Sequence, residues 1–194
     1  MKWFSKINRG VILTAVILIG VIIYLVSLSV MQSGDKAPIE KVCKDYIASY
    51  NKYQLLPKVG NAEKPAMSQD ELNVFFGELE NELKPYFLGN TGDTVIKNMK
   101  ENLKNQAKGI DVVHKYEKEV ISINNITFNK ATAVVNLTTH TTFDGPSHNL
   151  YKGDGSMPTK REEKSGDTRD EIRLAKENGK WYITSAYLLT SDKG

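Results

Sequence analysis

The chain has 194 residues, of which 26 are Lys or Arg and 23 are Asp or Glu, so its formal net charge is +3. Three basic residues at the start, Lys2, Lys6 and Arg9, account for this excess, and the remaining charges balance. A neutral remainder lacks the concentrated positive surface that phosphate binding needs, so we expect no nucleic-acid partner. The single cysteine, Cys43, excludes an internal disulfide, and we expect it to be a small buried apolar side chain.

The first predicted element is an apolar run. Residues 11–31 read VILTAVILIGVIIYLVSLSVM and contain no charged residue. About 20 apolar residues in a helix cross the hydrocarbon core of a bilayer, so this run predicts a transmembrane helix in contact with membrane lipid. By the positive-inside rule, residues 1–10 form a cytoplasmic tip and the C-terminal part lies outside the cell membrane. The alternative is a cleaved signal peptide, although its apolar region is usually about 7 to 15 residues long.

A soluble domain is predicted to follow this run. Residues 32–38 (QSGDKAP) are polar and contain Gly and Pro, which predicts a short tether. Residues 39–190 are sufficient for one domain with its own core. From Ile39 to Tyr50, apolar residues recur at three- and four-residue steps, which predicts an amphipathic helix that ends near residues 53–57.

Two further helices are predicted. Ser68 and, three residues later, Glu71 form the capping-box pattern that begins a helix, and Pro85 ends it. A third helix runs from about Thr94 to Gly109, with a narrower apolar stripe. A stripe of Met and aromatic residues at this spacing is typical of a packed core rather than of a cofactor site. We therefore expect no cofactor.

The second half of the sequence predicts a sheet, because its apolar residues recur at every second position. Residues 112–128 and 131–143 predict two strands joined by a two-residue break, and the second strand has one more apolar face, so the sheet should have one covered side. Asn178-Gly179 lies between two alternating runs and predicts a long hairpin over residues 169–189, since both turn residues accept positive φ.

The segment between these two pairs of strands permits two interpretations. Residues 144–167 contain four glycines, two prolines and the charge run 160–164. This segment is too long and polar for a tight turn. It is either a long loop, or the two flanking strands extend into it as a protruding arm.

The last strand carries a resemblance to a known fold. It reads NGKWYITSAYLL, and Gly179, Lys180, Trp181 and Ile183 match a pattern common in the final strand of the NTF2-like (cystatin-like) superfamily. This resemblance implies an α+β fold with three helices packed on a bent antiparallel sheet, a cone. With one membrane helix in front, the layout is similar to the VirB8 and TcpC-like components of conjugative type IV secretion machines. The resemblance implies a membrane-anchored extracytoplasmic scaffold module that binds other envelope proteins or a second copy of itself.

The sequence contains no catalytic pattern. Its histidines, His114, His140 and His148, do not have metal-ligand spacing, and Asp144 and Asp154 do not repeat as in a calcium-binding loop. We therefore predict no metal site, no catalytic residue and no enzymatic activity, with His140 solvated or hydrogen-bonded on the polar sheet face.

Two other functions stay open. The first is a ligand-binding or enzymatic domain that uses a pocket between helices and sheet, with Tyr46, Tyr50, His140 or Tyr182 as lining residues. The second is a membrane-tethered regulator or immunity-type protein that blocks a partner near the membrane surface.

Overall fold

The structure is a computed structural model that describes residues 9–57, 67–146 and 161–188, without the side chains of residues 9–16 and 24–32. The chain divides into two compact units, Met1–Ile39 and Glu40–Gly194, which we describe separately.

The first unit contains the beginning of the long helix α1 (Arg9–Lys52). Residues 32–38, predicted as a tether, are helical in the structure, and Pro38 lies inside the helix. Within the predicted membrane span, the side chains of residues 17–23 are described, and all of them are exposed. The other side chains of the span lie outside the described part. Within the described residues, no helix meets the length and hydropathy of a membrane span. The transmembrane helix at 11–31 therefore stays a prediction.

The helices of the second unit begin and end where local signals place them. Helix α2 (Gln69–Leu83) begins at a complete capping box: the Glu71 amide donates to the Ser68 hydroxyl at 3.2 Å, and the Ser68 amide donates to the Glu71 carboxylate at 2.9 Å. At Pro85 the chain continues as the 3-10 helix η2 (Lys84–Tyr86), and helix α3 (Asp93–Ala107) follows. These predicted helices are confirmed.

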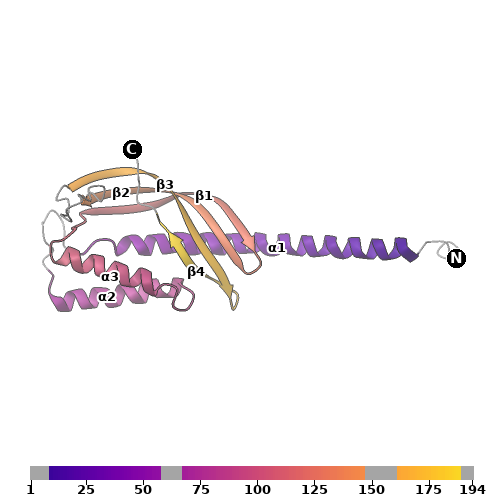
Figure 1. The fold of residues 1–194 in the computed structure, drawn as a ribbon, viewed down its shortest axis with the longest axis horizontal. Helices are drawn as coiled ribbons and strands as arrows, with labels where there is room; N and C mark the ends of the chain where they lie inside the picture. Colours follow the sequence, from indigo (N-terminus) through magenta and orange to yellow (C-terminus); the bar gives the residue numbers. More distant parts are fainter. Residues whose placement is uncertain (1–8, 58–66, 147–160, 189–194) are drawn as a thin grey trace, which may run out of the picture. The chain divides into compact units, whose positions relative to one another are not determined.

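The sheet is an antiparallel meander of four strands in the described part of the chain, with the order β1-β2-β3-β4. Asn178 and Gly179 form the last turn with φ values of 49° and 80°, which confirms the predicted hairpin. Figure 1 shows α2 and α3 on the same side of this sheet. The strands are β1 (Lys115–Asn129), β2 (Thr132–Pro146), β3 (Arg161–Glu177) and β4 (Lys180–Tyr187).

The pairing of β2 with β3 decides between loop and arm. The two strands stay in register as far as Pro146 opposite Arg161, so part of the segment 144–167 extends the sheet as an arm. Residues 147–160 lie outside the described part.

Strand β1 contains two irregularities that the alternation pattern did not reveal. Its register with β2 shifts between Val120 and Ser122 and again between Ile123 and Asn125. A β-bulge inserts one unpaired residue and bends the strand. Residues that share the inner face are consequently three apart here, at Val120, Ile123 and Ile126, rather than two apart.

The core of the second unit lies between the helices and one face of the sheet. The apolar face of α2 is buried, and so are Ala133, Val135 and Leu137 on β2. Cys43 is fully buried, as predicted, and burial raises the pKa of its thiol to about 12. The α+β prediction is confirmed, and helices against an antiparallel sheet fit the NTF2-like cone that the sequence resembles.

Candidate functional site

The inner face of the sheet carries a buried ion pair. The Lys118 ammonium on β1 lies 2.9 Å from the Asp170 carboxylate on β3, and both side chains have 0% exposure. Three threonines complete the cluster: Lys118 donates to the Thr141 and Thr168 hydroxyls at 3.2 and 3.3 Å, and the Thr139 hydroxyl donates to Asp170 at 2.7 Å. Burial lowers the pKa of Lys118, and Asp170 opposes this shift. Because solvent reaches neither charge, the pair is part of the structure of the core.

Aromatic rings from three parts of the second unit pack together near this cluster. Tyr46 contacts Phe87 edge-on with ring centroids 5.4 Å apart, and Tyr50 contacts Tyr116 with centroids 6.3 Å apart. Burial raises the pKa of the Tyr46, Tyr50 and Tyr116 hydroxyls. These phenols therefore stay protonated at neutral pH and do not act as bases.

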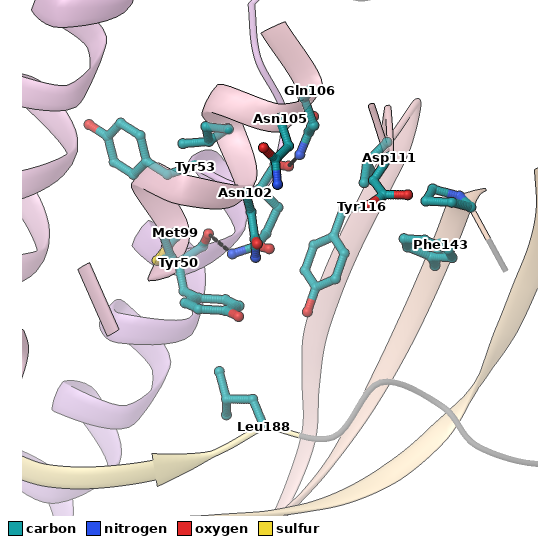
Figure 2. A pocket seen from close by; sticks show the side chains of 14 residues that line it. Tyr50, Tyr53, Met99, Asn102, Asn105, Gln106, Asp111, Tyr116, Phe143 and Leu188 are labelled. Carbon is teal, nitrogen blue, oxygen red and sulfur yellow. Dashed lines mark hydrogen bonds between the residues drawn. The ribbon is translucent and has the colours of Figure 1, made fainter. Parts of the chain in front are cut away.

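A cavity of about 220 Å³ opens beside the aromatic rings, between the ends of α1 and α3 and the first residues of β1 (Figure 2). Aromatic rings and carboxamides form most of its wall, and Asp111 supplies its carboxylate. The aromatic lining residues are Tyr50, Tyr53, Tyr116 and Phe143, and the carboxamides are those of Gln54, Asn102, Asn105 and Gln106.

Two side-chain hydrogen bonds hold the walls of the cavity together. The Gln106 amide on α3 donates to the Gln54 carbonyl at 3.1 Å, just beyond the end of α1. The Asn51 amide on α1 donates to the Lys118 carbonyl on β1. These contacts tie both helices to each other and to the sheet, so the cavity has a fixed wall.

The residues that the sequence suggested as pocket lining are separated in the structure. Tyr50 lines the cavity, whereas Tyr46, His140 and Tyr182 are not among its lining residues. Tyr46 is 1% exposed within the aromatic cluster. The sequence does contain a signal for the actual lining, namely Asn102, Asn105 and Gln106 near the end of α3. Periodicity alone does not distinguish these carboxamides from those of a solvated helix end.

His140 lies on the outer, polar face of the sheet. Its Nδ1 is 2.7 Å from the Asp167 carboxylate, and its Nε2 is 2.8 Å from the Ser165 hydroxyl. This confirms the expected hydrogen-bonded histidine. His114 directly precedes β1, and its amide donates to the Asp144 carbonyl at 2.7 Å. Within the described residues no group of three potential ligands could hold a metal ion; His148 and Asp154 lie outside that part.

Asp144 is paired with an arginine rather than placed for calcium binding. The Arg161 guanidinium on β3 donates to both oxygens of the Asp144 carboxylate at the arm. This hydrogen-bonded pair lowers the pKa of Asp144 and keeps the carboxylate ionised.

The two edges of the sheet differ. At the β4 edge, the Ile183 carbonyl accepts from both the Leu88 amide and the Thr91 hydroxyl, each at 3.1 Å, and Phe87 forms a parallel bridge to the same residue. At the other edge, Asn51 occupies the Lys118 carbonyl, and β1 continues past it to the bulge at Ile121, whose side chain is 56% exposed. The second half of β1 is therefore the candidate interaction edge.

Comparisons with known proteins give structural matches only. No protein-family model and no curated protein matches the chain. The crystal structure of the intermembrane space region of the chloroplast protein ARC6 is similar over 78% of this chain and 96% of its own, with 13% identity and a TM-score of 0.41. An Ntf2-like protein involved in plasmid conjugation is similar over 79% of this chain and 49% of its own, with 8% identity and a TM-score of 0.39.

Proposed function

We propose that the chain is a membrane-anchored, extracytoplasmic protein-interaction module whose NTF2-like domain binds other envelope proteins or a second copy of itself. The observation that carries this proposal is the second half of β1, from Ile121 to Asn129, at the edge of the sheet. The main-chain groups on one side of an edge strand are available to pair with another strand. Exposed Ile121 adds apolar area beside them.

The interaction is tested by crosslinking from the edge strand. A photoreactive benzoylphenylalanine replaces Ile121 in the full-length protein, and crosslinks are formed in intact cells. Val74 on α2 is the matched control, since it is also an exposed aliphatic residue, at 64% exposure. We expect one defined crosslinked envelope protein, or a dimer, from position 121 and none from position 74. Equal products from both positions would refute an interface at β1.

The membrane anchor rests on the uncharged run 11–31 and on the basic residues before it. Its topology is testable because Cys43, the single cysteine, is fully buried and does not react while the domain is folded. A cysteine introduced at exposed Lys97 on α3 should therefore be labelled by a membrane-impermeant maleimide in intact cells. Labelling only after cell lysis would place the domain inside, and release of the protein by alkaline carbonate would exclude a spanning helix.

The finer proposal is that the envelope partner belongs to a conjugative type IV secretion complex. Its support is the sequence layout of one membrane helix before a domain with the NTF2-like final strand. Mass spectrometry of the product crosslinked from position 121 tests it directly. A component of such a complex supports this proposal, and a partner from another machine refutes it while leaving the interaction edge in place.

A further inference from the structure

The described wall of the cavity contains a carboxylate and no cationic side chain. The proposed protein-interaction function does not require such a wall. Figure 2 shows fourteen residues that line it within the described part of the chain, and among these fourteen there is no Lys, Arg or His. Asp111 contributes a carboxylate. Lys118, a buried cation on β1, is paired with Asp170. The described wall therefore carries one net negative charge, that of Asp111.

The aromatic part of the wall adds to this bias. Tyr50 and Tyr116 both line the cavity (Figure 2), where their rings meet edge-on with centroids 6.3 Å apart, and Phe143 pairs across the strands with Tyr116. The faces of aromatic rings carry negative charge density and attract cations, most strongly when the cation has left water. Tyr116 is 7% exposed, so its ring is largely shielded from solvent.

The size of the cavity limits the ligand. A cavity of about 150 Å³ is sufficient to hold a benzene molecule. The value of about 220 Å³ leaves room for a compact ion with one short polar substituent. The carboxamides of exposed Asn102 and half-buried Asn105 can bind such a substituent by hydrogen bonds.

We propose that this cavity binds a small organic cation, a substituted ammonium ion that lies against the rings of Tyr50 and Tyr116 and is balanced by the Asp111 carboxylate. This site is independent of the interaction edge on β1. Its occupant is selected by charge and by aromatic contact, so an anion or a neutral molecule of the same shape is disfavoured.

The charge requirement is tested with a matched pair of probes. Choline and its uncharged carbon analogue 3,3-dimethylbutan-1-ol are titrated into the full-length protein in maltoside micelles and followed by calorimetry. We expect choline to bind about tenfold more tightly than the analogue. Equal binding of both probes, or binding of neither, would overturn the proposal.

The carboxylate is tested with Asp111→Asn. Asp111 has a φ of 52°, a conformation that Asn also adopts readily, so the substitution removes charge without backbone strain. We expect choline to bind about fivefold more weakly and the neutral analogue to bind unchanged. Asp70→Asn, the same change on the exposed surface of α2, is the control and should leave both affinities as they are. An unchanged choline affinity in Asp111→Asn would overturn the role of Asp111.

The aromatic contact is tested at Tyr116. Tyr116→Phe keeps the ring and should bind choline within about twofold of the original protein, whereas Tyr116→Leu should lose most of the affinity. If the Leu variant fails to fold, Phe143→Leu tests the same wall. Phosphocholine separates the sources of the cation: weaker binding than choline indicates a free cation, and binding at least as tight assigns the site to a lipid headgroup.

Discussion

The buried pair of Lys118 and Asp170 makes a quantitative prediction about stability. Asp170→Asn keeps the shape of the side chain and its contact with the Thr139 hydroxyl, but it takes the negative charge away from a fully buried ammonium. Removing one partner of a buried ion pair costs about 3 to 5 kcal/mol of unfolding free energy. This is a large part of the 5 to 15 kcal/mol that is typical of a domain. Lys118→Met should cost a similar amount, because it leaves the carboxylate buried.

The double variant distinguishes a coupled pair from two separate contacts. With both charges removed, Lys118→Met/Asp170→Asn should cost no more than either single change, so the coupling energy should be at least about 3 kcal/mol. Urea unfolding of the full-length protein in detergent, followed by the fluorescence of buried Trp181 in a Trp3→Phe background, measures all four proteins. Additive costs, or single costs below about 1 kcal/mol, would refute the coupling.

The pH dependence of the Asp170→Asn variant has a definite sign. Burial lowers the pKa of Lys118 below its ordinary value of 10.5, and without Asp170 nothing in the pair opposes that shift. Between the lowered pKa and 10.5 the unfolded chain binds more protons than the folded chain, so the stability of the variant should rise with pH in this window.

Three further predictions concern local structure and are checked by equilibrium unfolding. Ser68→Ala removes the hydroxyl of the capping box and should cost about 1 kcal/mol. Gly92→Ala should destabilise the domain, because its new Cβ would collide with the buried Phe87 ring. Gly77 lies in an open position inside α2, so Gly77→Ala should stabilise the domain by about 0.5 to 1 kcal/mol. The thiol pKa of Cys43 rises from 9.0 to about 12 on folding, so its contribution to stability is fully present below pH 9. Above pH 9 this contribution should fall by up to about 1.4 kcal/mol per pH unit. Cys43→Val should abolish that slope.

The elements that the sequence predicted well have signals confined to a few neighbouring residues. Ser68 and Glu71 define a helix start through their own hydrogen bonds, and Asn178-Gly179 defines a turn through its backbone conformation. Neither signal depends on distant parts of the chain. The arm was left undecided because a strand extension such as Pro146 opposite Arg161 is set by pairing across the sheet.

The predicted tether shows how context overrides composition. Gly34 and Pro38 disfavour a helix by about 1 and 3 kcal/mol, which is why the segment reads as a linker. A helix that is already formed on both sides needs no new nucleus to continue through such residues. The observed helix α1 does continue through them.

The buried ion pair was missed because each charge was read alone, yet the alternation contains its signal. Lys118 is in phase with buried Tyr116, whereas Lys115, Glu117 and Glu119 are on the opposite face. Asp170 is likewise in phase with buried Ile172. A charge in phase with apolar residues on each of two strands predicts an inward pair. The alternation does not reveal that β2 lies between these two strands. Only the sheet order shows this, and it places threonines of β2 against both charges.

Strand β1 relates the two proposed sites and also separates them. Tyr116 lies near the start of β1 and lines the cavity, while Ile121 lies at the first bulge and begins the interaction edge. Between them, Lys118 is fixed through its side chain to β3 and through its carbonyl to α1. The bulge breaks the regular register, so a partner that pairs beyond it does not need to displace Tyr116. With the photoreactive residue moved to exposed Thr127, a charged residue at position 121 should therefore abolish crosslinking at the edge without changing choline affinity. A parallel loss of both would mean that the two sites are one.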